Sequence, residues 1–85
     1  MSTEHAETIK TILDIFHKEF PDKTVLQIVD FDLSTYVVCA LGPENVNMNP
    51  YFSFDKDTQD ISEFNVLDHF HEYWKAVGLA TIYEN

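Results

Sequence analysis

Apolar residues recur at helical spacing near both ends of the chain. The first stripe lies between residues 3 and 20 and consists of Ile9, Ile12, Leu13, Phe16 and Phe20. The second stripe lies between residues 65 and 77 and consists of Val66, Leu67, Phe70, Tyr73, Trp74 and Val77. This pattern predicts two amphipathic helices, one at each end of the sequence.

Residues at the ends of these stripes predict where the helices begin and end. Pro21 disfavours helical geometry at the residue before it, so the first helix ends there. Asn65 is a suitable N-cap for the second helix. Gly78 follows at the position of a Schellman glycine, which places Leu79 to fold back on Trp74.

Between the helices, residues with high strand propensity predict two β-hairpins. The first hairpin joins Val25–Phe31 to Tyr36–Leu41, and the second lies within Tyr51–Phe64 with its turn at Lys56–Asp60. The second turn lacks glycine. Any left-handed position in this turn would therefore have to be taken by Asp57, Thr58 or Gln59, which makes the turn slightly strained.

The element order is α-β-β-β-β-α, which predicts an α+β fold formed by one small domain of residues 1–85. We expect a single layer of antiparallel sheet, with three to four strands, on which the N- and C-terminal helices pack. Residues 42–50 predict an exposed loop and a candidate contact surface. Residues 79–85 are apolar enough to dock as a short strand or as coil.

The strands of the first hairpin are apolar on both sides. Strict alternation places Val25, Val29 and Phe31 on one side, and Leu26 and Ile28 on the other. Strands of this kind usually have both sides covered. Either one helix covers each face of the sheet, or both helices share one face and the other face meets a second molecule. We favour the second arrangement.

The charge balance is strongly acidic, with 15 Asp and Glu against 5 Lys and Arg and a formal net charge of −10. All five cations are Lys, so no guanidinium group is present to grip a phosphate in two places. Direct binding to nucleic acid or to an anionic membrane is therefore disfavoured, whereas a basic protein partner is favoured. The single cysteine, Cys39, fits a buried position in a reducing compartment, and no long apolar segment is present, so we expect a cytoplasmic protein.

The sequence does not match the motifs of common metal-binding, phosphate-binding or catalytic sites. An EF-hand loop starting at Asp55 needs Gly and Glu at positions that here hold Asp60 and Val66. His69 and His71 are two residues apart and diverge on a helix. With only two glycines, the chain has no phosphate-binding loop. We therefore expect no catalytic residues, no cofactor and no metal, and a protein that is not an enzyme.

The segment YFSFDKDTQDISEF, residues 51–64, resembles a hairpin of small acidic α/β proteins from bacterial prophages or toxin–immunity loci. The shared pattern is an aromatic strand, an Asp-Lys-x-Thr turn and a strand that ends in Glu-Phe. The turn departs from the pattern at Gln59, where glycine is usual. The resemblance covers about 14 of the 85 residues and implies an inhibitor or accessory protein that binds another protein.

These observations predict an interaction module or inhibitor whose acidic surface binds a basic or nucleic-acid-binding protein. The candidate contact residues are Asp55, Asp57, Asp60, Glu63, Glu44 and Tyr51. The alternative is a small accessory or structural subunit that associates through an apolar sheet face, with the charge serving solubility alone. Homodimerisation stays open under either hypothesis.

Overall fold

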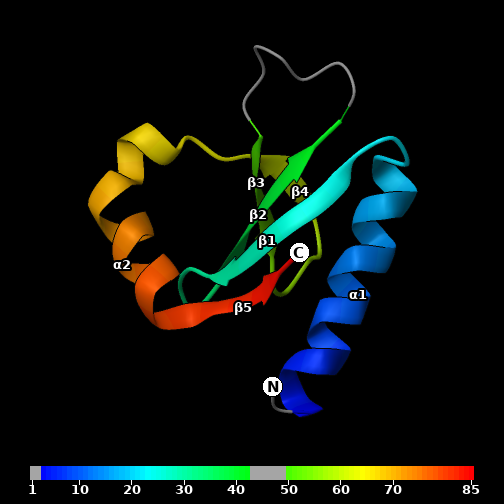
Figure 1. Ribbon diagram of the computed structural model, residues 1–85, viewed down its shortest axis with the longest axis horizontal. Coiled ribbons are helices and arrows are strands. Elements are labelled where there is room, and N and C mark those ends of the chain that lie inside the picture. Colours follow the sequence, from blue (N-terminus) through cyan, green and yellow to red (C-terminus); the bar gives the residue numbers. More distant parts are fainter. Residues whose placement is uncertain (1–2, 43–49) are drawn as a thin grey trace.

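In the computed structural model, which describes residues 3–42 and 50–85, one antiparallel sheet has the strand order β4-β3-β2-β1-β5 (Figure 1). The elements in chain order are α1 (Thr3–Glu19), β1 (Thr24–Asp30), β2 (Thr35–Leu41), β3 (Tyr51–Asp55), β4 (Ile61–Glu63), the 3₁₀ helix η1 (Val66–His69), α2 (Phe70–Ala80) and β5 (Thr81–Glu84). The α+β class, the antiparallel sheet and the two helices are confirmed. The strand count was too low, because the tail forms a fifth strand beside β1.

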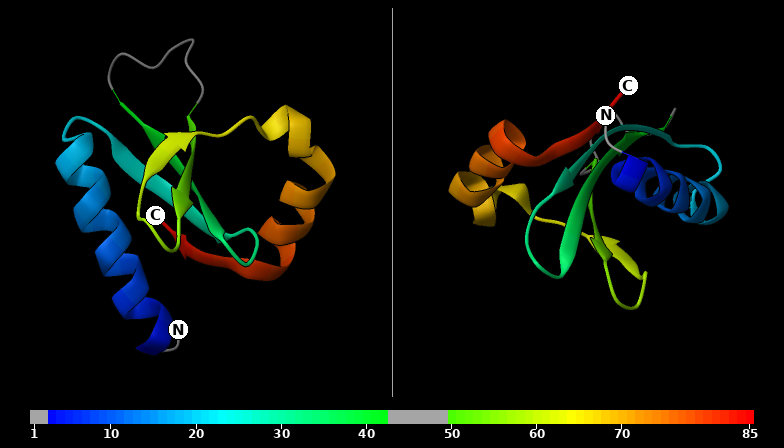
Figure 2. Two further views of the ribbon diagram at one scale, coloured as in Figure 1. Left: turned by 180° about the vertical axis from the view of Figure 1, so that it is seen from behind. Right: turned by 90° about the horizontal axis from the view of Figure 1, so that it is seen from below.

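The two helices lie on opposite faces of the sheet, as the right-hand view of Figure 2 shows. The core on the α1 side includes Ile9, Ile12, Phe16, Val25, Ile28, Val38, Phe52 and Phe54. The core on the α2 side is smaller and consists of Val29, Val37, Phe64, Tyr73 and Ala76. The arrangement with both helices on one face is therefore wrong, because α2 covers the face that we expected to stay open.

A β-bulge explains why strict alternation misassigned the first strand. The register between β1 and β2 shifts between Val25 and Gln27, which adds one residue to β1. As a result, Val25 and Ile28 both lie in the core on the α1 side, although they are an odd number of residues apart. Val29 lies in the core on the α2 side, away from Val25, contrary to the expectation.

The second helix also differs from the prediction at both ends. Asn65 accepts a hydrogen bond from the Leu67 N–H as expected, but it caps η1, and α2 begins only at Phe70. Gly78 is not a Schellman cap, because α2 continues to Ala80 and no described glycine has a positive φ. The Thr81 hydroxyl donates to the Val77 carbonyl at 2.7 Å, and the chain passes directly into β5.

The turn between β3 and β4 contains one left-handed residue, and it is one of the three non-glycine candidates named from the sequence. Gln59 has φ 63°, and it is the one non-glycine residue with positive φ among residues 3–42 and 50–85. A left-handed conformation costs a residue with a Cβ about 1–2 kcal/mol. We therefore expect Gln59→Gly to stabilise the fold by about 0.5–1 kcal/mol in urea unfolding, since the entropy cost of glycine offsets part of the gain. Thr58→Gly, at the preceding residue, is the matched control, and an equal gain there would contradict this explanation.

Candidate interaction surfaces

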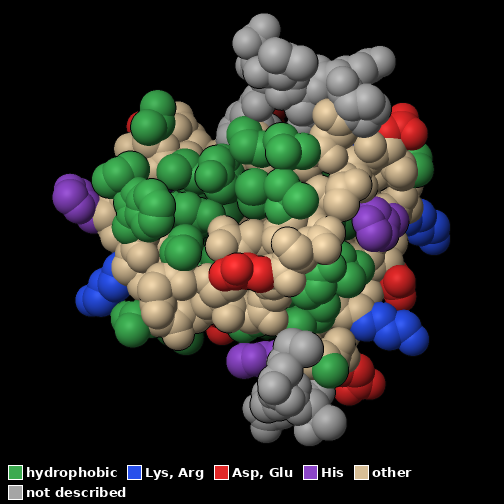
Figure 3. Space-filling model, viewed as in Figure 1, with side chains coloured by type: hydrophobic (Ala, Val, Ile, Leu, Met, Phe, Trp, Pro, Cys, Tyr) green, Lys and Arg blue, Asp and Glu red, His purple; other side chains and the backbone are tan. Residues whose placement is uncertain are grey.

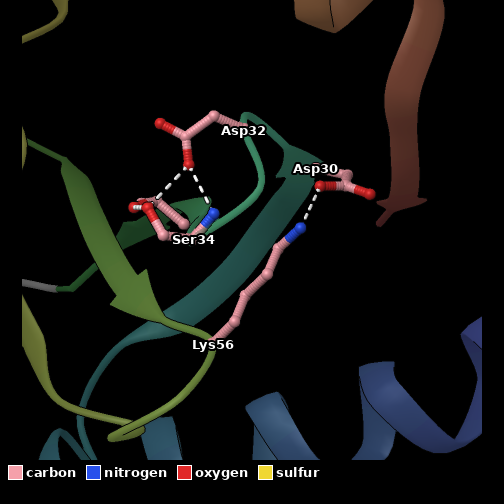
Figure 4. Close-up of polar contacts among 5 residues, drawn as sticks. Asp30, Asp32, Ser34 and Lys56 are labelled. Atoms are coloured by element: carbon pink, nitrogen blue, oxygen red, sulfur yellow. Dashed lines mark hydrogen bonds and ion pairs between the residues drawn. The ribbon is translucent and has the colours of Figure 1, made fainter.

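Two turns from different hairpins lie side by side at one end of the sheet. The pairing of Thr35 with Asp55 between β2 and β3 brings them together, and the Lys56 N–H donates to the Ser34 carbonyl at 2.9 Å. The Lys56 ammonium group also reaches Asp30, with Nζ 2.6 Å from Oδ1 (Figure 4). These contacts fix the position of one turn relative to the other.

Each turn is held by an aspartate that accepts hydrogen bonds from residues that follow it. Asp32 Oδ1 accepts from the N–H of Ser34 at 2.9 Å and from its hydroxyl at 3.1 Å (Figure 4). Asp55 Oδ1 accepts from the N–H groups of Asp57 at 2.8 Å and Thr58 at 2.9 Å. These side chains therefore shape the turns, as aspartate does in Asx turns.

The same hydrogen bonds keep both carboxylates ionised. For Asp32, partial desolvation opposes the charge, but the hydrogen bonds from Ser34 and Thr35 outweigh it and lower the pKa. For Asp55, the N–H groups of Thr58 and Asp57 lower the pKa. Both groups thus remain negative to a lower pH than an ordinary aspartate does.

We call this end of the sheet the acidic turn surface, and it consists of Asp30, Asp32, Asp55, Asp57 and Asp60. Beside these five carboxylates lies one ammonium group, that of Lys56, which pairs with Asp30 and lies 4.6 Å from the centre of the Tyr36 ring. Three of the residues were predicted contacts. Asp30 and Asp32 were missed, because their position beside Asp55 depends on strand pairing.

The other predicted contact residues lie elsewhere. Tyr51 and Glu63 line a groove of about 570 Å³ with Asn65, Val66 and Leu67, at the opposite end of the second hairpin. Glu44 lies outside the described residues, as does most of the loop of residues 42–50. The five predicted contact residues that the structure describes therefore form two groups in space.

A second exposed surface is apolar and lies on η1 and α2. Leu67 is 82 % exposed, Phe70 is 47 % exposed and Trp74 is 57 % exposed. The rings of Phe70 and Trp74 lie edge to face with 6.0 Å between their centres. We call these three residues the apolar helix surface. In Figure 3, hydrophobic side chains gather over α2 and the adjoining face of the sheet.

The buried side of α2 is anchored through Tyr73. Its hydroxyl donates to Gln27 Oε1 of β1 at 3.0 Å, and its ring lies 5.4 Å from that of Tyr51. Burial, followed by the proximity of Tyr51 and Cys39, raises the pKa of Tyr73. Cys39 is half-buried, where a fully buried thiol was expected, and burial raises its pKa as well.

The two surfaces adjoin one another through aromatic rings. Phe31 directly precedes Asp32, and its ring lies 5.1 Å from Phe64 and 6.1 Å from His69 of η1, measured between ring centres. His69 stacks on Phe64 and forms an ion-pair contact with Glu72 at 3.4 Å when it is protonated. A partner that contacts the acidic turns can therefore also reach η1 and α2.

Other features of the described part of the chain do not indicate a different kind of site. No group of three or more His, Cys, Asp or Glu residues within it converges as metal ligands would. None of its helices is long and apolar enough to cross a membrane. The chain matches no protein-family model, and it has no significant match among curated proteins or solved structures.

Proposed function

We propose that this protein is a non-enzymatic, cytoplasmic interaction module that binds a partner protein with a basic surface. The observation that carries the proposal is the acidic turn surface, where two joined turns present five carboxylates and a single ammonium group, that of Lys56, which pairs with Asp30. Charge of one sign in a fixed arrangement raises the association rate with an oppositely charged surface and discriminates against other partners. An inhibitor or accessory protein of prophage or toxin–immunity type would act in this way.

The geometry of the two turns favours partner binding over solubility as the explanation of the charge. Solubility requires only net charge, which can be spread over the whole surface. Here, hydrogen bonds from Ser34, Asp57 and Thr58 hold Asp32 and Asp55 in place, and the Lys56 contacts join the two turns. A partner therefore meets carboxylates whose positions are already fixed, which lowers the entropy cost of binding.

The test uses a double substitution that removes two charges from the acidic turn surface. Asp57→Asn with Asp60→Asn changes exposed side chains, and Asp55, which holds the turn, stays intact. The probe is poly-L-lysine, titrated at low salt and then at moderate salt. We expect the double variant to bind about three- to tenfold more weakly than the wild type, because each carboxylate contributes some tenths of a kcal/mol or more to such contacts.

The matched control removes the same two charges from α1. Asp14→Asn with Glu19→Gln also changes exposed residues and gives the same net charge. We expect this variant to bind about as well as the wild type. If both variants lose affinity equally, then binding depends only on the net charge of the protein, and the acidic turn surface is not the binding site.

A second candidate function follows from the apolar helix surface. An accessory subunit would associate through Leu67, Phe70 and Trp74, and the charge would serve solubility alone. This replaces the earlier alternative, in which the sheet face was the contact, because α2 covers that face. Salt discriminates the two functions, since apolar association persists in high salt and electrostatic association weakens.

A further inference from the structure

A groove lies between α1 and the sheet, next to the acidic turn surface, and its volume is about 340 Å³. Glu7 and Ile12 belong to the α1 wall. Tyr36, Phe54 and Gln59, from β2, β3 and the turn after β3, belong to the opposite wall. Ligand pockets in proteins have volumes of about 300–1,000 Å³, so this groove is at the small end of that range. Its size suits one side chain or a small molecule.

The groove has an apolar floor and a polar rim. Ile12 and Phe54 are buried in the core between α1 and the sheet, and Tyr36 packs against that core. Glu7 and Gln59 are exposed. A groove of this kind suits an amphipathic side chain, whose apolar stem packs on the floor while its polar head stays near the solvent.

The charges in the groove are unbalanced. Lys56 also lines it, but its Nζ lies 2.6 Å from Asp30 Oδ1, so this positive charge is already neutralised (Figure 4). Glu7 adds a carboxylate, and no side chain among the described residues forms an ion pair with it. The groove therefore complements a group with a single positive charge. The net charge of −10 on the whole chain acts in the same direction.

Gln59 contributes an amide to the groove at a cost to the fold. Its φ of 63° is unfavourable for a residue with a side chain, and glycine would take this conformation more readily. Residues held in such conformations cluster at binding sites. Glycine would lack the amide, which offers an oxygen acceptor and an NH₂ donor. The cost is explained if this amide contacts a ligand in the groove.

Among cationic side chains, arginine matches the lining best. Its guanidinium group has five N–H donors in one plane, and the two walls offer acceptors in the Glu7 carboxylate and the Gln59 amide oxygen. Its methylene groups and the flat face of its head pack well on apolar and aromatic side chains such as Phe54.

The groove is continuous with the acidic turn surface. Lys56 and Gln59, which line it, belong to the same turn as Asp57 and Asp60, whose side chains are exposed. A protein that contacts these carboxylates can therefore insert one of its side chains into the groove.

We propose that the groove receives one arginine side chain of the basic partner protein. The head group pairs with Glu7 and accepts no bond itself, so it donates to Glu7 and to Gln59, and the stem lies on Ile12 and Phe54. This inference rests on the proposed function, because it specifies one contact of the same interface. The carboxylates of the turns attract the partner, and the groove selects the residue that enters.

The probe is N-acetyl-L-arginine amide, which carries the side chain without charged backbone groups. At low salt, we expect it to shift the amide NMR signals of residues 7–12 and of Gln59, with a dissociation constant of about 1 mM for a ligand of this size. Signals of α2 should stay unchanged. N-acetyl-L-citrulline amide has nearly the same shape but no charge, and it should shift none of these signals. N-acetyl-L-lysine amide should bind about threefold more weakly, because its head group is not planar and has fewer donors.

One substitution tests the charge of the groove. Glu7→Gln retains the size of the side chain and removes its charge, and we expect about fivefold weaker binding of the arginine probe. Glu19→Gln is the matched control, because Glu19 is an exposed carboxylate of the same helix that does not line the groove. Its affinity for the probe should equal that of the wild type.

A second substitution separates binding from folding. Gln59→Gly removes the amide but relieves the left-handed conformation, so we expect about threefold weaker binding by a variant that resists urea better than the wild type. Thr58→Gly adds the same flexibility at the neighbouring residue, which does not line the groove, and should bind the probe as the wild type does.

The inference fails if the arginine probe shifts no signals of residues 7–12, if citrulline or lysine binds equally well, or if Glu7→Gln and Gln59→Gly both keep wild-type affinity. If this happens while Asp57→Asn with Asp60→Asn still weakens binding of poly-L-lysine, then the groove is not a contact and the proposed function stands. If the probe binds in the groove but that double variant binds poly-L-lysine normally, then the proposed function fails, and the groove has no part in such an interface.

Discussion

Replacement of Phe16 by alanine is expected to destabilise the protein by about 3–5 kcal/mol, the range for a buried phenylalanine. Phe16 has no exposed surface, and its ring lies 5.0 Å from Phe20 and 5.4 Å from Phe52, measured between ring centres. Alanine leaves a cavity between α1 and the sheet that these rings cannot fill. At roughly 0.05–0.15 kcal/mol per residue, the 85 residues have about 4–13 kcal/mol of stability, so the loss is a large part of it.

Urea unfolding followed by far-ultraviolet circular dichroism measures this effect. Phe70→Ala is the matched control, because it removes the same side chain from a half-exposed position on α2. We expect the control to cost less than about 1 kcal/mol, as surface substitutions do. Similar midpoints for the two variants would contradict the packing of α1 against the sheet.

The second large effect is expected at Tyr73, which anchors α2 to the other face. Tyr73→Ala removes the hydrogen bond to Gln27 and the ring contact with Tyr51, and we expect a cost of about 3 kcal/mol or more. Tyr73→Phe retains the ring and removes only the hydroxyl, so its expected cost is about 1 kcal/mol. Amide hydrogen exchange should show the loss of protection in α2 before that in α1.

The raised pKa of Tyr73 adds a pH dependence to the same prediction. Burial favours the neutral phenol in the folded state, while the unfolded chain ionises near the ordinary tyrosine pKa of about 10. The contribution of Tyr73 is therefore complete below pH 10 and is lost as the pH rises toward the folded-state pKa. Tyr73→Phe should flatten the alkaline decline of the unfolding free energy, and an unchanged decline would contradict the buried position of the hydroxyl.

Periodicity and propensity predicted much of this fold. The helical stripe that contains Ile9 and Phe16 is the buried side of α1, and both predicted hairpins form. The left-handed residue of the second turn, Gln59, is one of the three candidates that the sequence offered. These features depend on neighbours in the sequence, and local patterns therefore predict them well.

Features that depend on distant contacts were not predictable in this way. The bulge at Val25 and Gln27 arises from the register with β2, which no local pattern specifies. The tail became a strand because the outer edge of β1 offers hydrogen bonds to it. Gly78 followed the pattern of a helix cap, but α2 continues to Ala80 and ends where Thr81 takes the extended conformation of β5.

In the candidate surfaces, too, groupings of neighbouring residues were predictable from the sequence, and groupings that depend on distant contacts were not. Asp55, Asp57 and Asp60 share a turn and were visible as a group, while Asp30 and Asp32 join them only through the pairing of β2 with β3. The second apolar stripe is too wide to be buried completely against one face of the sheet. Tyr73 and Ala76 face the sheet, and the rings of Phe70 and Trp74 remain in solvent.

The pairing of β5 with β1 has a consequence for how the protein is made. The last strand of the sheet, Thr81–Glu84, hydrogen bonds to the first, Thr24–Asp30, and the helix that covers the second face directly precedes it. During synthesis, Thr24–Asp30 leaves the ribosome before Thr81–Glu84 does. One edge of β1 therefore stays unpaired until Thr81–Glu84 has also emerged, and in that interval it can pair with the strand of another chain.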